Sequence, residues 1–560
     1  MMDFNQLGTN MTAMNSKYPR VRLQGALGHA LSTTCENRLK KVDYRLLEAP
    51  FRERSENDGG WRCEFWGKIV RSAILANHSL QDAELSEIIR STVKNMLATQ
   101  TEDGCISSYP EEKQTSSWDV WGRKYALLAL LRYYDFFEAD PAVRLACIRM
   151  LDHLITQANP EAKDIRSCGE HGGLAPCSIL GAVVGVYRIS GEKRFLDYAK
   201  YIVDSGCSKK HDIFAAAREE CHPEAIGNGK AYEMTSCFQG LAELQQFIPC
   251  QEYLDTCVKY FQNVRQREIF ITGVGGLKDC CGEYWYDGAF KQTRNDSGIL
   301  GETCVTTTYL HYCEAMSRLI DSAIPMVEAE RSLYNGILGA MSPDGTQWIH
   351  CNPTPLTGGG AKIPADDQIL RGFHKPFGGN DCCLAQGPEA LALAPRLALV
   401  PTQNGAALNL LEPLQAQMAD GTSINVSGNY PYEPSAEISV RADKDFCLRV
   451  RIPASCANVS FNGDSCSFTP GQYLDFKGPW QAGNRIKLDF DFSLKEMTPP
   501  DGSPYTAVMR GPLVLAESID KAKPAPVKET WRGRKLIDYA SAGNSMRAED
   551  TFTVWFPNDK

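Results

Sequence analysis

The stretch CEFWGKIVRSAILANHSL, residues 63–80, carries the pattern that decides the fold of this chain. Its apolar residues recur at spacings of three and four, as they do on one face of an α-helix. Similar stretches follow one another from about Ala26 to about Arg396, separated by Gly, Pro and Asn residues. We therefore expect about a dozen helices in this region. The periodicity fits both a closed double ring of helices and an open superhelix.

The period changes from three or four residues to two after about Leu397. DFCLRVRIP (445–453) and RIKLDFDFSL (485–494) alternate apolar with polar residues, and Gly- and Pro-rich turns separate such runs. This pattern predicts an antiparallel β-sandwich with one solvated face. The tail after about Ile519 is expected to be irregular, with a last strand near TFTVWF (551–556). We thus expect an N-terminal extension (1–25), a helical domain (26–396) and a β-sandwich domain with an irregular tail (397–560).

Length, charge and cysteine content narrow the class of protein. The chain has 560 residues, too many for one ordinary core, and 59 basic against 68 acidic residues give a net charge of −9. That balance argues against a nucleic-acid partner. The N-terminus has no basic segment followed by an apolar run, and no stretch has about 18 consecutive apolar residues, so we expect neither a signal peptide nor a membrane span. A homodimer is compatible with the sequence, which does not determine the oligomeric state.

The 21 cysteines are an odd number and are spread through the predicted helices. Two pairs are adjacent in sequence, Cys280–Cys281 and Cys382–Cys383, and neighbouring cysteines are poor disulfide partners. Reduced thiols in a cytoplasmic protein are therefore the simpler interpretation.

Two short segments place ligand-type side chains at predicted helix starts. GETCVTTTYL (301–310) contains Glu302 and Cys304, and NDCCLAQG (380–387) contains Cys382 and Cys383. Residues two apart in a regular helix point about 200° apart, so Glu302 and Cys304 converge only if Glu302 precedes the first turn. One carboxylate and three thiolates form a reasonable tetrahedral Zn²⁺ set. The alternative is packed core thiols with a capping Glu, and the spacing alone does not decide between them.

A set of motifs in a fixed order resembles a known family. These motifs are WDVWGRKYALLALLRYYDF (118–136), AYEMTSCFQGLAEL (231–244), GVGG (273–276), CCGEYW (280–285), GETC (301–304), CC (382–383) and MRGPLVLAE (509–517). Together they resemble glycoside hydrolase family 127, the β-L-arabinofuranosidase family, from about Trp61 to Glu517. The resemblance implies an (α/α)6 barrel followed by a C-terminal antiparallel β-sandwich.

The resemblance also implies a site and a reaction. It implies Zn²⁺ held by Glu302, Cys304, Cys382 and Cys383, with Cys382 as nucleophile and Glu283 as general acid/base. The Cys382 thiolate would attack the anomeric carbon of a sugar while Glu283 protonates the leaving oxygen. Water activated by Glu283 would then hydrolyse the glycosyl-cysteine with overall retention. Cys280–Cys281 is a rival metal pair, but the family order favours the later pair.

We therefore predict a Zn²⁺-dependent, retaining exo-glycosidase that acts on a terminal β-L-arabinofuranoside or a related sugar, in a small glycoside or oligosaccharide. Two alternatives stay open. One is a lyase or epimerase on the same barrel, which would use a His/Tyr or His/His pair without a thiolate. The other is a non-catalytic carbohydrate-binding protein with a structural zinc.

Four further residues are candidates for binding the sugar: His171, Lys230, His374 and Trp118. The two histidines lie in Gly-rich loops, and Trp118 is either a core residue or a stacking platform. Members of the family hold the furanose with several histidines, whereas GNGKAYEM (227–234) has Lys230 where a His is expected. A cationic Lys230 would suit an acidic or differently hydroxylated sugar, so the resemblance does not establish which sugar is bound.

Overall fold

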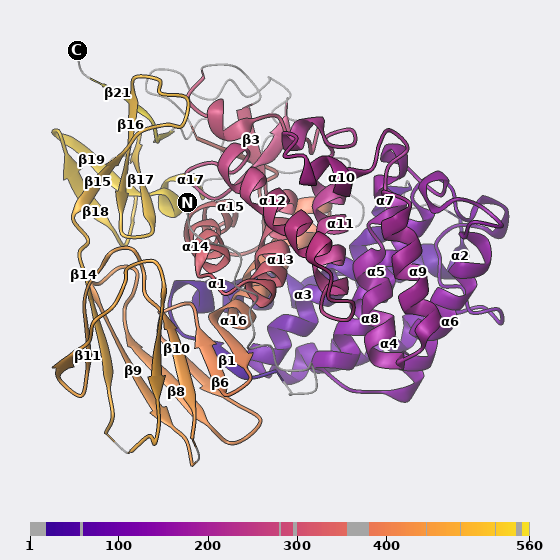
Figure 1. Cartoon of the computed structure of the whole chain (residues 1–560), viewed down its shortest axis with the longest axis horizontal. Helices are drawn as coiled ribbons and strands as arrows, with labels where there is room; N and C mark the ends of the chain where they lie inside the picture. Colours follow the sequence, from indigo (N-terminus) through magenta and orange to yellow (C-terminus); the bar gives the residue numbers. More distant parts are fainter. Residues whose placement is uncertain are drawn as a thin grey trace.

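The computed structural model describes residues 18–55, 60–278, 282–294, 299–354, 380–443, 445–481, 483–520, 522–544 and 552–558. A helical part, which holds the N-terminal half of the chain, lies beside a part made of strands (Figure 1). Helices predominate up to residue 398, and strands predominate from residue 399 onward.

Six helices of the described chain form the inner ring of the helical part. They are α3 (Glu64–Leu80), α5 (Asp119–Phe136), α8 (Leu180–Ser190), α11 (Ala231–Leu244), α13 (Thr303–Leu319) and α16 (Cys382–Ala398). Each packs against the next, and α16 packs against α3, so the ring is closed. The outer helices are α1 (Ala26–Asn37), α4 (Ala83–Leu97), α6 (Pro141–Gln157), α9 (Lys193–Asp204), α12 (Gln251–Arg267) and α14 (Ile324–Arg331). The helical part is therefore an (α/α)6 barrel, as predicted, and not an open superhelix.

Shorter helices lie between these or after them. They are α2 (Tyr44–Glu53), α7 (Leu174–Cys177), α10 (Ile213–Arg218), α15 (Leu338–Ala340) and α17 (Tyr539–Gly543).

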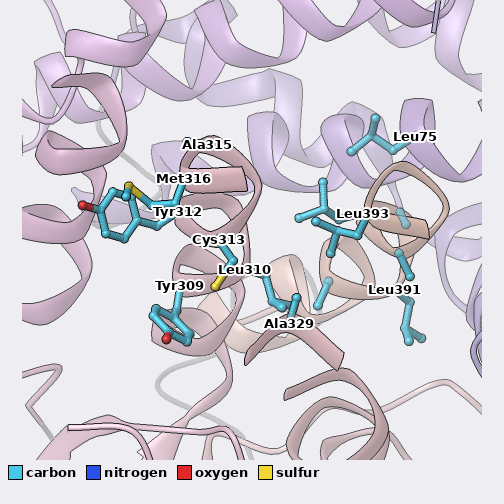
Figure 2. Packing of buried hydrophobic residues seen from close by; sticks show 14 of the residues in the cluster. Leu75, Tyr309, Leu310, Tyr312, Cys313, Ala315, Met316, Ala329, Leu391 and Leu393 are labelled. Carbon is cyan, nitrogen blue, oxygen red and sulfur yellow. The ribbon is translucent and has the colours of Figure 1, made fainter. Parts of the chain in front are cut away.

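The inner helices are buried on nearly all sides, so their side chains form the barrel core. Figure 2 shows Leu75 of α3, Leu310 and Cys313 of α13, and Leu391 and Leu393 of α16 among the buried residues. The contact between α3 and α5 is close enough to need a glycine. A Cβ atom on Gly67 would lie 2.4 Å from the Tyr125 carbonyl oxygen, which no ordinary side chain tolerates.

The connections between helices place the starts of all inner helices at one end of the barrel. An inner helix leads into its outer partner through a short turn, as at Gln81–Asp82 between α3 and α4 and at 191–192 between α8 and α9. Asp82 caps α4 by accepting a hydrogen bond from the Leu85 amide. Long connections such as 98–118, 205–230 and 268–302 return to the other end. Long loops therefore gather where the inner helices begin.

Two sheets follow the barrel. The larger has the strand order β1-β7-β8-β9-β14-β11-β12 and the smaller has the order β13-β10-β6-β5. The strands of the larger sheet are β1 (Arg20–Leu23), β7 (Leu414–Gln417), β8 (Ser423–Gly428), β9 (Ser435–Arg441), β11 (Cys456–Phe461), β12 (Asp464–Ser465) and β14 (Ile486–Phe490). Those of the smaller sheet are β5 (Leu399–Thr402), β6 (Gly405–Leu408), β10 (Cys447–Arg451) and β13 (Tyr473–Lys477). All pairs within them are antiparallel except β6–β10, which is parallel.

The predicted alternation holds in these sheets, with one informative exception. Leu448 and Val450 of β10 are buried, as are Ile486 and Leu488 of β14. Arg451, expected on the solvated face, is 1% exposed and forms an ion pair with Glu330 of α14 at 2.5 Å. This face of the strand meets the barrel, so a paired charge lies where the sequence pattern predicted contact with water.

The structure differs from the predicted domain plan at both ends of the chain. Residues 20–23, expected in a simple extension, form β1 and pair with β7 of the larger sheet. The segment after Ile519, expected to be irregular, contributes strands and α17 to a further sheet. That sheet consists of β15 (Leu494–Met497), β16 (Tyr505–Arg510), β17 (Leu513–Ser518), β18 (Lys528–Trp531), β19 (Arg534–Asp538), β20 (Phe552–Thr553) and β21 (Phe556–Pro557). The sequence does not predict β18 and β19, because their alternating runs are short and polar turn residues separate the runs.

One helical stretch, His171–Ser190, is long and apolar enough to cross a membrane by length and composition. It contains α8 of the inner ring, and 67% of its most apolar window is buried inside the protein. A core helix of a barrel passes the same test, so this stretch is weak evidence for a membrane span.

Candidate active site

A cluster of donor atoms lies where α13 and α16 begin. Glu302 is the last residue of β3 (Ile299–Glu302) and occupies the N-cap position of α13, with extended backbone angles of −115° and 139°. Cys382 and Cys383 form the first turn of α16, which Asp381 caps by accepting from the Leu384 amide at 2.7 Å. Glu302 therefore precedes the helix, the geometry that convergence with a cysteine requires.

Four buried side chains bring one donor atom each to the same point. They are Glu302, His350, Cys382 and Cys383, and their donor atoms all lie within 4.8 Å of one another. The Cys383 sulfur is 3.4 Å from Glu302 Oε1 and 3.2 Å from His350 Nδ1. The Cys382 sulfur is 4.0 Å from Glu302 Oε1 and 3.7 Å from His350 Nδ1.

These separations, which range from 3.2 to 4.0 Å, are close to those of a tetrahedral metal site. With bonds of about 2.0–2.3 Å to Zn²⁺, neighbouring donors lie about 3.3–3.8 Å apart. The remaining two distances are 4.0 Å between the two sulfurs and 3.6 Å between His350 Nδ1 and Glu302 Oε1. Glu302 is 0% exposed, and its Oε2 atom has no hydrogen-bond partner among the described residues. A buried carboxylate facing two thiols is unfavourable unless a cation compensates it, so the residues fit a metal ion.

His350 is a ligand-type residue that the sequence analysis did not identify. It directly precedes β4 (Cys351–Pro353), which pairs with β3 so that Cys351 lies opposite Glu302. This pairing brings His350 beside Glu302 across a gap of almost fifty residues. The sequence around it, WIHCNP, matches no metal-binding spacing, so only a prediction of the strand pairing would have identified it.

Cys304, the fourth predicted ligand, lies against the cluster. Its thiol interacts with those of Cys382 and Cys383, and its sulfur is 3.9 Å from the Lys68 ammonium. Cys304 thus offers a fifth donor next to the four that converge, one more than a tetrahedral ion takes.

The electrostatics distinguish the three thiols. Hydrogen bonds from Cys304 and Cys383, aided by His350, outweigh burial and hold the pKa of Cys382 well below its usual value. Burial raises the pKa of Cys304 and Cys383 well above the usual value for a thiol. Burial, together with the nearby Glu283 and Cys382 charges, also raises the pKa of Glu302. Of the three thiols, Cys382 is the one that the surroundings favour as thiolate.

Glu283, the predicted acid/base, forms an ion pair with Lys230. Glu283 Oε2 lies 2.5 Å from Lys230 Nζ, and the Ala231 amide donates to the Glu283 carbonyl at 2.7 Å. Burial would raise the pKa of Glu283, but the Lys230 charge outweighs it and lowers the pKa. Glu283 also interacts with both Glu302 and Cys382. The predicted acid/base therefore lies beside the predicted nucleophile.

Three of the predicted sugar-binding residues, Lys230, His171 and Trp118, lie at the same end of the barrel. Glu233 lies close to two of them. Glu233 Oε2 is 3.9 Å from Lys230 Nζ, and Glu233 Oε1 is 3.7 Å from His171 Nε2. The His171 ring packs edge-on against Trp118, with centroids 5.3 Å apart. Glu233 is 1% exposed and its Oε2 atom accepts no hydrogen bond from a described residue. His374 and the Cys280–Cys281 pair lie outside the described residues.

The carboxylate of Glu64 also lies at the end of the barrel where the inner helices begin. It accepts from Lys68 Nζ at 2.7 Å and from Trp121 Nε1 at 2.6 Å. Glu64 and Glu233 were not identified from sequence, since each resembles an ordinary acidic residue near a helix start. Their burial beside the cluster is what distinguishes them.

Comparisons with known proteins identify the family of the chain. The catalytic-domain model of glycoside hydrolase family 127 β-L-arabinofuranosidases matches residues 20–396, and the family's middle-domain model matches residues 406–492. A non-reducing end β-L-arabinofuranosidase of Bifidobacterium longum is 23% identical over 494 residues, covering 78% of this chain and 73% of that protein.

Solved structures of the family share the fold. A family 127 β-L-arabinofuranosidase from Geobacillus stearothermophilus T6 has a TM-score of 0.75 at 18% identity, over 96% of this chain and 100% of that one. Another family 127 β-arabinofuranosidase has a TM-score of 0.76 at 18% identity, over 97% and 98%. This chain therefore belongs to glycoside hydrolase family 127 and is a glycoside hydrolase.

Proposed function

We propose that this protein is a metal-dependent, retaining exo-glycosidase that uses Cys382 as nucleophile and Glu283 as general acid/base. The observation that carries the proposal is the convergence of Glu302, His350, Cys382 and Cys383 on one point, beside Glu283. The substrate class is a small glycoside or oligosaccharide with a terminal β-L-arabinofuranose or a related sugar, in line with the names of the relatives.

The donor set suits Zn²⁺, with Glu302, Cys383, Cys382 and either His350 or Cys304 as ligands. Zn²⁺ bound there would favour the thiolate form of Cys382 at neutral pH. The two soft sulfur donors disfavour Mg²⁺ and Ca²⁺, which prefer oxygen ligands.

The reaction proceeds in two displacements. The Cys382 sulfur forms a bond to the anomeric carbon as the bond from that carbon to the leaving oxygen breaks, and Glu283 gives that oxygen a proton. In the second step Glu283 takes a proton from water, whose oxygen attacks the anomeric carbon and displaces the Cys382 sulfur. When Glu283 takes up a proton, the Lys230 ammonium group still has a counter-ion, because Glu233 Oε2 lies 3.9 Å from Lys230 Nζ.

The charges around Lys230 support a neutral sugar. Its ammonium group contacts Glu283 and lies near Glu233, so its charge is already balanced by carboxylates. A uronic acid would add a further negative charge beside Glu64, Glu233 and Glu283. The buried Oε2 atom of Glu233 instead suits a sugar hydroxyl as donor.

The test is hydrolysis of aryl glycosides, with β-L-arabinofuranoside first, followed by neutral and acidic pyranosides. We expect release of the aryl group with retention at the anomeric carbon, seen by proton NMR, and loss of activity with a zinc chelator. Cys382→Ser should lower kcat by about 10³-fold or more while the protein stays folded. Inversion at the anomeric carbon, or full activity in Cys382→Ser, would refute the mechanism.

A further inference from the structure

The barrel contains a second polar site at the end opposite the cysteine cluster. A cavity of about 80 Å³ lies among the inner helices and extends toward their C-terminal ends. Arg132 and Asp135 of α5, Arg188 of α8 and Arg318 of α13 line this end of it. None of the five candidate metal ligands is among the residues that line the cavity.

The charges around the cavity do not balance. Five arginines surround it or contact its wall, and they are Arg71, Arg132, Arg188, Arg318 and Arg396. Lys124 also lines the cavity, but burial lowers its pKa to about 7. Four carboxylates stand against the arginines, Asp135, Glu243, Glu314 and Glu389. The arginines therefore exceed the carboxylates by one positive charge.

The ion pairs within this set show which arginine carries the excess positive charge. Asp135 forms an ion pair with Arg188 at 2.5 Å, Glu389 pairs with Arg71, and Glu314 is shared by Arg318 and Arg396. Arg132 forms no ion pair with any described residue. Its guanidinium instead lies over the Phe136 ring, at 5.6 Å, on which Arg396 also packs.

Two buried nitrogen atoms in the cavity wall have no hydrogen-bond partner among the described residues. Arg71 is 5% exposed and His311 is 3% exposed, and both line the cavity. The two atoms are Arg71 Nε and His311 Nδ1. Arg71 Nε is an N–H donor, and a buried donor without an acceptor is unfavourable, so an acceptor in the cavity would satisfy it.

The field in the cavity favours negative charge, as two groups in its wall show. Burial would raise the pKa of Tyr18, but Arg318 and Arg396 outweigh it and lower that pKa. Burial, together with Arg396 and Arg71, lowers the pKa of Arg132. Both shifts have the sign expected beside uncompensated cations.

We propose that this cavity is a binding site for a small oxyanion, held by Arg132 with Arg71. Guanidinium groups pair with two oxygens of one carboxylate, phosphate or sulfate, which favours an oxyanion over a halide. Phosphate and a small carboxylate share this chemistry, and the experiment separates them. The site is independent of the glycosidase reaction.

Thermal unfolding of the full chain tests the proposal, with inorganic phosphate, sulfate, acetate or succinate added in a zwitterionic buffer at constant ionic strength. A ligand that binds only the folded protein raises Tm with concentration. We expect a saturable rise with at least one oxyanion relative to chloride, and the most effective anion identifies the class. Arg132→Gln should remove that rise, whereas Arg194→Gln, an exposed arginine of α9 paired with Asp152, should retain it.

A second variant tests the proposal if Arg132→Gln does not fold. Arg132→Lys keeps the charge and loses the paired donors, so it should weaken the anion effect by about tenfold in concentration. Direct binding of inorganic phosphate, seen as broadening of its ³¹P NMR line, should follow the same order among the variants. Equal anion effects in wild type and in both Arg132 variants, or no effect beyond chloride, would overturn the proposal.

Discussion

At the scale of single residues, His350 and Cys304 are the two candidates for the fourth ligand beside Glu302, Cys382 and Cys383. His350 Nδ1 is 3.2 Å from the Cys383 sulfur, whereas Cys304 contacts the two thiols from the side of Lys68. Both residues are buried, so neither is replaced by water without a cost.

We expect His350→Ala to raise the dissociation constant for Zn²⁺ at least about 100-fold, because even the loss of an outer-shell partner weakens metal binding by about 10–100-fold. The measurement is competition with a chromophoric chelator. Cys304→Ser is the matched variant, and the Co²⁺-loaded proteins report the number of bound thiolates through their charge-transfer absorption. An unchanged affinity in His350→Ala, together with a large loss in Cys304→Ser, would assign the fourth position to Cys304.

A second residue, Glu389, contributes to the way the stability of the barrel depends on acid pH. Burial disfavours its charge, but Arg71 and His311 outweigh burial and lower its pKa to about 2. Because the folded-state pKa lies below the unfolded value, this ionised group stabilises the protein above about pH 4.5. The stabilisation is lost as the pH falls from there toward 2.

Glu389→Gln leaves Arg71 buried without its counter-charge, so we expect a loss of about 3–5 kcal/mol in unfolding free energy at pH 7. The difference from wild type should shrink between about pH 4.5 and 2, as measured by urea unfolding at several pH values. A difference that stays constant down to pH 2 would contradict this assignment.

At the scale of elements, the start of α16 positions both vicinal cysteines. Asp381 accepts from the Leu384 amide and so holds the first turn, in which Cys382 and Cys383 follow each other. Adjacent residues of a helix point about 100° apart, so both sulfurs reach one ion only at a helix end that faces it.

Asp381→Ala should cost about 1 kcal/mol of stability through loss of the cap. It should also weaken metal binding, because the first turn of α16 frays. Asp381→Asn, which retains a capping oxygen, is the control and should keep most of the stability and the metal affinity. Calorimetric unfolding and the chelator competition measure the two effects. If Ala and Asn behave alike, the cap does not organise the cluster.

At the scale of the whole molecule, buried polar contacts join the barrel to the sandwich. Arg451 of β10 pairs with Glu330 of α14, and Tyr430 donates to the same carboxylate at 3.1 Å. Strand β1, which precedes the first barrel helix, lies at the edge of the larger sheet. Residues 20–23 therefore belong to a sheet of the domain that follows the barrel (Figure 1).

Arg451→Met should destabilise the protein by about 3–5 kcal/mol, because Glu330 is left buried with an unpaired charge. The double variant Arg451→Met/Glu330→Leu should recover much of that loss, since no charge then stays buried. Thermal unfolding of Arg451→Met, Glu330→Leu and the double variant gives the coupling energy of the pair that joins the domains. Additive effects of the two substitutions would show that the pair does not link them.

The sequence by itself determined the class of each element and the order of the two main parts. The three-to-four-residue period predicts the main helices between α3 and α14, and the two-residue period predicts β10 and β14, because both depend on local burial. The motif resemblance supplied the closed barrel and three members of the four-donor cluster, Glu302, Cys382 and Cys383.

Only the tertiary structure decided the rest. His350 reaches the cluster because β4 pairs with β3, a contact between distant segments that local periodicity does not encode. Arg451 is buried because its strand meets α14, although the alternation predicted a solvated position. The charge of Lys230 is balanced because the chain near Glu283 returns to the start of α11. In each case, the environment of the side chain depends on residues far away in sequence, and local pattern carries no information about them.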